Sequence, residues 1–254
     1  MQTVDKTLLA VARVGVFLVP FIPVIVVSSL FFPFITGKGF AFRIIVEVIF
    51  ACWLLLALRH PAYRPKHSLL LSGVLSFIGI VFLADALAVN PFKAFWSNFE
   101  RMEGFITMIH LCAYFLVATS VLDEEKWWHR FFATSVGVSA FLGVYGLLQL
   151  SGKIPINQGG VRLDGTFGNA AYFAGYMLVH IFLTLFLIFR QRITVGFRWL
   201  YGGALALQVV TLYFTATRGA AVGLVGGLLL TMLLIALFEN KYNRLRIGAA
   251  GSLL

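Results

Sequence analysis

The sequence predicts an all-α polytopic transmembrane helix bundle of about eight spans, and three observations support this prediction. Hydrophobic residues make up 60% of the chain and charged residues only 12%, whereas soluble globular domains carry roughly 25% charge. The mean hydropathy is +0.93. The apolar residues form blocks of about 20, the length that crosses about 30 Å of hydrocarbon as a helix. They lack the alternation in segments of roughly 10 residues that is typical of a membrane barrel.

Eight apolar blocks follow one another along the chain, separated by short polar loops. They cover residues 12–34, 40–58, 68–87, 104–122, 131–150, 170–189, 198–215 and 219–238. The first block is too long for a signal-peptide core and has no small-residue cleavage site behind it. We therefore expect a retained helix that kinks at Pro20 and Pro23.

The 254 residues are expected to form a single transmembrane domain. After a basic turn at residues 240–246 the chain reads Ile-Gly-Ala-Ala-Gly-Ser-Leu-Leu, as though a ninth span had begun. We therefore expect the sequence to be the N-terminal part of a longer protein.

The basic residues predict a cytoplasmic N-terminus. In that orientation the inner segments hold 13 of the 20 lysines and arginines, in agreement with the positive-inside rule. The other seven lie in outer loops: Lys38, Arg43, Lys93, Arg101, Lys153, Arg162 and Arg218. Because topology explains most of the net charge of +10, no nucleic-acid partner is expected. Membrane lipids are expected to surround the helices.

Four of the outer arginines lie at or near the N-terminal ends of spans that run inward. They are Arg43, Arg101, Arg162 and Arg218. A cation at the positive end of a helix dipole is unfavourable by up to about 1 kcal/mol, so the repeated arrangement makes sense if an anion lies between these residues. The alternative is that the arginines reach the phosphates of lipid headgroups.

Two of these arginines have acidic neighbours. Arg43 stands four residues before Glu47, so a helical ion pair accounts for it. Arg101 has Glu100 and Glu103 beside it, so local charge compensation and anion binding are both open.

Arg162 and Arg218 are the stronger candidates for anion binding. Arg162 has only Asp164 nearby, and Arg218 has no acid within many residues. The turns that would support them contain Gly165, Gly168, Asn169, Thr217 and Gly219. A basic residue, a glycine-rich backbone and the start of a helix together are suited to holding an anion.

The sequence shows no other arrangement of catalytic or metal-binding residues. It contains no Ser-His-Asp arrangement, no Walker-type loop and no metal-ligand spacing, so no metal or cofactor is expected. Three histidines in cytoplasmic loops are expected to be solvated: His60, His67 and His129. His110 and His180 lie within spans, where interhelical hydrogen bonds are expected.

Three polar stretches on the expected outer face share their order and topological placement with a known family. They are residues 90–104 (NPFKAFWSNFERMEG), 162–169 (RLDGTFGN) and 217–220 (TRGA). Over about residues 85–225 the chain thereby resembles the N-terminal half of the bacterial O-antigen ligase and O-antigen polymerase superfamily. Ala170 departs from the pattern, because many relatives have proline after the Gly-Asn pair.

The resemblance implies a glycosyltransferase of the bacterial inner membrane that uses neither a metal nor a nucleotide sugar. Such an enzyme takes a glycan from an undecaprenyl diphosphate carrier at the periplasmic face and transfers it to an acceptor, which in ligases is the lipid A core or sometimes a protein. The family's paired arginines, which hold the diphosphate, map onto Arg162 and Arg218, and we add Arg101 as a third candidate. The family's catalytic histidine belongs to a large periplasmic loop further along the chain, beyond residue 254.

Two alternatives stay open. An O-antigen polymerase uses the same donor but extends a second lipid-linked chain. A lipid-carrier binding protein or transporter would perform no chemistry. Transporters place charged residues near mid-membrane in corresponding halves, and the spans show only Glu47 and Asp85 as candidates. Glycosyl transfer also needs a general base near the acceptor hydroxyl, and the sequence identifies none.

Overall fold

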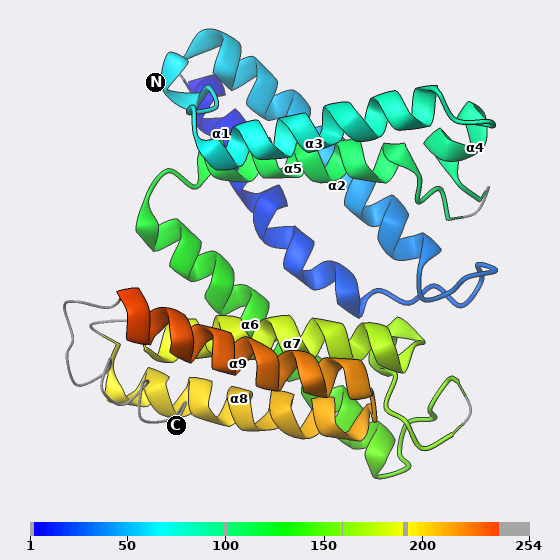
Figure 1. Cartoon of the computed structure of the whole chain (residues 1–254). Coiled ribbons are helices and arrows are strands. Elements are labelled where there is room, and N and C mark those ends of the chain that lie inside the picture. The colour runs from blue at the N-terminus through cyan, green and yellow to red at the C-terminus, as the bar shows by residue number, and fades with distance from the viewer. Residues whose placement is uncertain (1–2, 99–100, 159, 190–192, 239–254) are drawn as a thin grey trace. The chain divides into compact units, whose positions relative to one another are not determined.

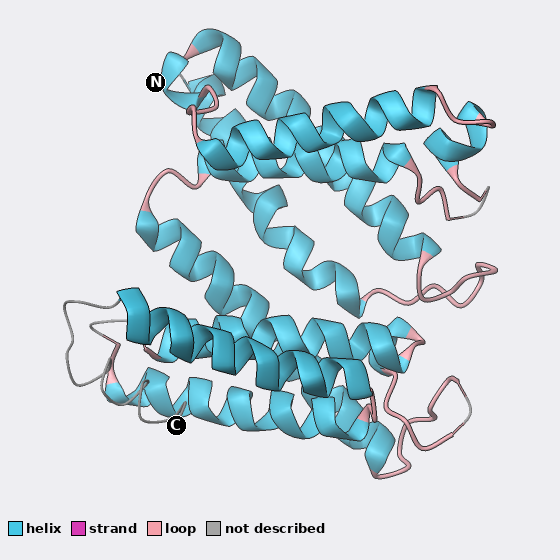
Figure 2. Ribbon diagram, in the orientation of Figure 1, coloured by secondary structure: helices cyan, strands magenta, loops and turns pink. Residues whose placement is uncertain are grey.

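The computed structural model describes residues 3–98, 101–158, 160–189 and 193–238. Every regular element in these ranges is a helix (Figure 2), so the predicted all-α class is confirmed. The long helices are α1 (Thr3–Leu18), α2 (Thr36–Arg59), α3 (Leu69–Ala86), α5 (Phe105–Val121), α6 (Glu125–Leu150), α7 (Ala170–Ile188), α8 (Val195–Phe214) and α9 (Arg218–Phe238). The short ones are η1 (Val19–Val24), η2 (Pro61–Tyr63), α4 (Pro91–Trp96) and η3 (Gly165–Phe167).

Within the described ranges, seven helical segments are long and apolar enough to cross a membrane, with α1 and η1 counted as one segment. The remaining expected span, residues 104–122, corresponds to α5, an apolar helix of 17 residues. The chain is therefore a multi-pass membrane protein whose helices contact membrane lipids. The ninth span expected after residues 240–246 lies outside the described residues.

The predicted position of the first span, residues 12–34, is wrong. The helical segment covers residues 3–24 and changes from α-helix to 3₁₀-helix after its sixteenth residue. Pro20 lies in the first turn of η1 and Pro23 lies inside it. Proline lacks the N–H group that continues an α-helix, so the α-helix ends where the prolines begin. Residues 25–35 then form turns and irregular backbone before α2 starts.

The chain packs as two compact units, Met1–Val138 and Ser139–Leu254. We call them the N-terminal unit and the C-terminal unit, and the boundary between them falls within α6. The expectation of a single transmembrane domain stays a prediction.

The core of the N-terminal unit lies among α1, α2 and α5. Each of the three helices contributes side chains that are nearly inaccessible to solvent, among them Val16, Trp53 and Val117. α1 and α2 approach closely at Gly15, where an added Cβ atom would collide with the Ile49 side chain. Small residues permit such close contacts between membrane helices.

The C-terminal unit is built around α7, which packs against both α8 and α9 (Figure 1). A buried polar chain ties α6, α7 and α8 together. Gln208 donates from Nε2 to Ser139 Oγ at 2.7 Å, and its Oε1 accepts a hydrogen bond from Thr184 Oγ1 at 2.9 Å. All three side chains are fully buried. Because lipid offers no hydrogen-bond partners, such side chains are paired across helices.

Candidate functional site

The loop between α6 and α7 is built around a buried carboxylate, Asp164. Its Oδ1 atom accepts hydrogen bonds from Gln149 Nε2 at 2.7 Å and from Asn157 Nδ2 at 3.3 Å. Its Oδ2 atom accepts one from the backbone N–H of Gln158 at 2.9 Å. These donors compensate the cost of burying a charge. Asp164 therefore holds the loop in shape and forms no ion pair with Arg162, its neighbour in sequence.

The glycines of this loop allow a turn that other residues would strain. Gly165 and Gly168 have φ angles of 55° and 61°, in the left-handed region that favours glycine. A Cβ atom at Gly165 would also lie 3.1 Å from the Phe173 ring. The Phe167 ring, between the two glycines, stacks on the Phe173 ring with a centroid separation of 5.6 Å. The loop thus folds tightly onto the first turns of α7.

Two side chains of the loop accept hydrogen bonds from backbone N–H groups at the start of α7. Asn169 is the N-cap residue, and its Oδ1 atom accepts from the N–H of Ala171 at 2.8 Å. The N–H of Ala170 donates to Gln158 Oε1 at 3.3 Å. The N–H of Gly165 is likewise bound, to Gln149 Oε1 at 2.8 Å. These three backbone N–H groups, at the turn where the sequence predicted an anion site, are thus engaged within the chain.

Arg162 reaches from this loop to the turn between α8 and α9. Its Nε atom donates to the carbonyl oxygen of Thr215 at 2.9 Å, and one Nη atom donates to Thr217 Oγ1 at 3.0 Å. Ala216 between these acceptors has a φ angle of 49°, which is uncommon for a residue with a side chain. The tight turn therefore presents both oxygens to one guanidinium group. The Arg162 side chain is otherwise exposed.

The same turn places Arg218 at the start of α9. Thr217, which accepts the Arg162 hydrogen bond, lies 3.4 Å from the Ala170 carbonyl oxygen, so the starts of α7 and α9 are adjacent. Arg218 and Gly219 are both exposed. Within the described part of the chain, neither the Arg218 guanidinium nor the backbone N–H groups of Arg218 and Gly219 have a hydrogen-bond partner. Arg162 and Arg218 thus both lie at the N-terminal end of α9, and both are exposed.

Arg101, the third candidate, belongs to the N-terminal unit and not to the unit that contains Arg162 and Arg218. Its guanidinium carbon lies 4.3 Å from the centroid of the Phe32 ring. Its Nε atom is buried and makes no hydrogen bond with the residues that the structure describes. A site shared by all three arginines stays a prediction.

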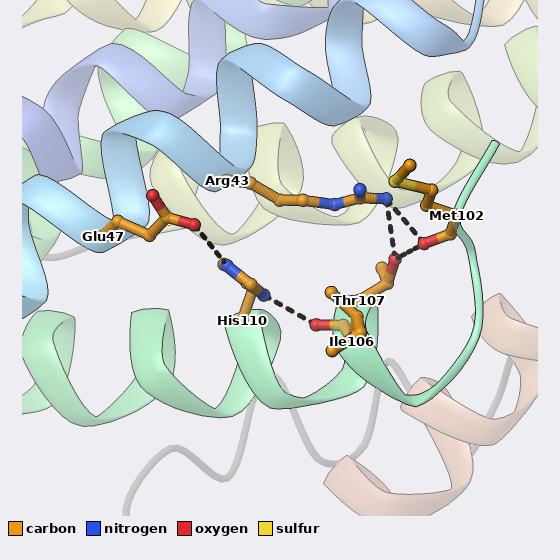
Figure 3. Close-up of polar contacts among 6 residues, drawn as sticks. All are labelled: Arg43, Glu47, Met102, Ile106, Thr107 and His110. Atoms are coloured by element: carbon orange, nitrogen blue, oxygen red, sulfur yellow. Dashed lines mark hydrogen bonds and ion pairs between the residues drawn. The ribbon is translucent and has the colours of Figure 1, made fainter. Parts of the chain in front are cut away.

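Arg43 does not form the ion pair with Glu47 that its spacing suggested. It is 8% exposed, and its Nη2 atom lies 3.0 Å from the Arg101 carbonyl oxygen and 2.6 Å from that of Met102. It also lies 3.3 Å from Thr107 Oγ1 (Figure 3). The acceptors lie 58 to 64 residues away in sequence, which is why local spacing could not reveal them.

Glu47 instead contacts His110 across helices. Its Oε1 atom lies 3.3 Å from His110 Nε2, while His110 Nδ1 lies 2.6 Å from the Ile106 carbonyl oxygen (Figure 3). The expected interhelical contact of His110 is therefore confirmed. The expectation that His60 is solvated is wrong, because its Nε2 atom lies 2.9 Å from the buried carboxylate of Asp5.

His129 and His180 are held by the backbone of their own helices. His129 was expected to be solvated, but it is buried, and its Nδ1 atom lies 2.8 Å from the Glu125 carbonyl oxygen. His180 Nδ1 lies 2.8 Å from the Tyr176 carbonyl oxygen. One turn of helix separates each histidine from the oxygen that it contacts.

No cluster of potential metal ligands occurs among the residues that the structure describes. No protein-family model, curated protein or solved structure matches this chain. The resemblance to the O-antigen ligase and polymerase superfamily therefore rests on the sequence motifs.

Proposed function

We propose that this chain is the membrane part of an O-antigen ligase-like glycosyltransferase of the bacterial inner membrane. It binds the diphosphate of an undecaprenyl diphosphate-linked glycan at the periplasmic face, through Arg162 and Arg218. The acceptor is a glycolipid or a protein. The reaction uses neither a metal nor a nucleotide sugar.

One observation supports this proposal above all: Arg162 is held at the turn that begins α9, through Thr217, the residue before Arg218. The Nε and Nη bonds to Thr215 and Thr217 orient the Arg162 guanidinium and leave its other Nη atom without a partner among the described residues. Arg218 leaves its whole guanidinium available, and the N–H groups at the start of α9 add further donors. An anion with several oxygens, such as a diphosphate, suits this set of donors.

The chemistry of glycosyl transfer explains why such donors would be useful. The bond between the sugar and the diphosphate breaks, and negative charge develops on the leaving diphosphate. Charge-assisted hydrogen bonds from fixed arginines stabilise that charge as it forms. In this proposal Arg162 and Arg218 bind and stabilise the leaving group, and the general base comes from the segment that the family resemblance places further along the protein.

The alternative without chemistry has an observation in its favour. Asp164, the acid closest in sequence to Arg162, is fully buried, and both of its carboxylate oxygens already accept hydrogen bonds. It is therefore poorly placed to act as a general base. A carrier-binding protein would use the same two arginines and need no base. An O-antigen polymerase would also use the same donor.

The test compares lysine variants of the two arginines in the full-length protein. Lysine keeps the charge but loses the planar fork that binds two oxygens at once, so Arg162→Lys and Arg218→Lys should each lower glycan transfer at least about tenfold, near the 1.5 kcal/mol expected for one charge-assisted contact. The assay follows labelled glycan leaving the lipid carrier in membranes at matched protein levels.

Arg198→Lys is the matched control. Arg198 is an exposed arginine in the first turns of α8, whose N-terminal end follows the C-terminal end of α7. Its lysine variant should transfer normally. Near-wild-type transfer by both test variants would refute the diphosphate site. If the wild type transfers no glycan and the two lysine variants bind the carrier more weakly, the carrier-binding protein is favoured.

A further inference from the structure

An open groove of about 590 Å³ runs along α1 in the N-terminal unit. Its apolar wall consists of Leu9, Val14, Phe17, Leu18 and Phe21. We call the part lined by basic and aromatic side chains from α1 and α6 its cationic end: Lys6, Arg13, Trp127 and Arg130. The groove is thus apolar along one part and cationic at the other.

Two of these cations remain free for a ligand. The acids near this end already have partners: Asp123 with Arg13, Glu124 with Lys126, Glu125 with His129, and Asp5 with both Arg59 and His60. Lys6 and Arg130, by contrast, have no acidic partner among the described residues, and both are exposed. The cationic end therefore carries charge that the chain does not neutralise.

Trp127 organises the cationic end. The guanidinium carbons of Arg13 and Arg130 lie 4.6 Å and 5.0 Å from the centroid of its ring, which is cation–π geometry. The Trp127 ring thus holds the positive charge of Arg130 at the edge of the groove.

We propose that the groove binds one anionic phospholipid. Arg130 and Lys6 hold the phosphate, the Trp127 ring supports the Arg130 guanidinium, and an acyl chain lies against the apolar part of α1. The charges identify the occupant: an acyl chain alone would leave the cations unpaired, and a soluble phosphate would leave the apolar wall uncovered. Basic pockets beside membrane helices are suited to anionic headgroups. The proposal concerns the N-terminal unit and does not depend on glycan transfer.

Lipid retention by the purified full-length protein tests the site. The protein is reconstituted in vesicles of equal parts phosphatidylcholine and phosphatidylglycerol, extracted in detergent and analysed by native mass spectrometry. The wild type should retain phosphatidylglycerol in preference to phosphatidylcholine. The double variant Lys6→Gln/Arg130→Gln should lower the apparent phosphatidylglycerol affinity at least about tenfold, since each basic residue near an anionic headgroup contributes about 1 kcal/mol.

The matched control is Lys66→Gln/Arg198→Gln, which removes the same charge from two exposed residues outside the groove. It should retain phosphatidylglycerol as the wild type does. Equal retention by the two double variants, or no lipid preference in the wild type, would overturn the proposal. Thermal unfolding of each variant confirms that it is folded.

A second variant tests the apolar part without changing charge. Val14 is 59% exposed, so Val14→Trp fills the groove and leaves the core intact. It should also reduce phosphatidylglycerol retention, because the acyl chain can no longer bury its apolar surface against α1. Unchanged retention by Val14→Trp would exclude the groove as the acyl site.

Discussion

Arg43 and Arg218 lie in similar places in the sequence, near the N-terminal ends of apolar helices, but the two units use them in opposite ways. Arg43 is buried and contacts two carbonyl oxygens and a hydroxyl group. Arg218 is exposed and has no such partner among the described residues. A guanidinium surrounded by the chain's own acceptors stabilises the fold, whereas one without acceptors is available to a ligand. The number of acceptors, more than position in the sequence, separates the two roles.

Arg162 lies between these extremes. It contacts two acceptors from the chain, as a structural arginine does, but it remains exposed. Its protein contacts orient the guanidinium without occupying all of its donors. Such an arginine can be both part of the turn and part of a ligand site, so its variants should affect stability and binding together.

The largest expected effect is the loss of stability on replacing Arg43. Arg43→Gln removes the charged donor from the Arg101 and Met102 carbonyl oxygens, of which only Met102 keeps another donor, Thr107 Oγ1 at 3.0 Å. Hydrogen bonds to charged groups contribute about 1.5–3 kcal/mol each. We therefore expect the free energy of unfolding to fall by about 3 kcal/mol, measured by denaturant titration in detergent micelles. Lys93→Gln, an exposed change in the same unit, should stay within about 0.5 kcal/mol. A loss below about 1 kcal/mol would mean that these carbonyls find other donors and that Arg43 is not structural.

This difference between arginines could not be predicted from the sequence. Apolar blocks of helical length predicted the all-α class, because the period and length of a span follow from local residues. The partners of Arg43 and Arg162 lie more than 50 residues away, so no local pattern shows them. The burial of Asp164 among its three donors was also not predicted, although these donors lie only 6 to 15 residues away. The sequence showed the prolines of the first span, but it did not predict that the α-helix starts at Thr3.

The glycine-rich loop gives the next largest loss of stability. Gly165→Ala places a side chain at a φ angle of 55° and 3.1 Å from the Phe173 ring, so we expect about 2 kcal/mol of destabilisation. Gly152→Ala is the control, because Gly152 has a φ angle of 74° and open space around its Cβ position. It should lose only about 1 kcal/mol. Equal losses would show that the loop does not press on α7 at Phe173.

Replacing Thr217 tests how much its hydrogen bond with Arg162 contributes to stability and to binding. Thr217→Val keeps the shape but removes the hydroxyl group that accepts from Arg162, so we expect about 1 kcal/mol of destabilisation. If Arg162 binds the donor diphosphate, carrier affinity should also weaken about fivefold, since 1.4 kcal/mol corresponds to tenfold. Thr194→Val is the control, because Thr194 precedes α8 and its side chain makes no capping hydrogen bond. Normal carrier affinity in Thr217→Val would limit the hydroxyl group to a structural role.

Arg218 should show the opposite pattern to Arg43. Because its side chain is exposed and makes no contact that the fold requires, Arg218→Gln should change the free energy of unfolding by less than about 0.5 kcal/mol. Removing a cation from the N-terminal end of α9 could even stabilise the helix by a few tenths of a kcal/mol. Glycan transfer should nevertheless fall at least about tenfold, because a diphosphate loses a charge-assisted contact. The two measurements are made on the same full-length preparation, with Arg43→Gln as the reference for a structural arginine. Loss of stability comparable with that of Arg43→Gln would show that Arg218 supports the fold, and the distinction between the two units would then not hold.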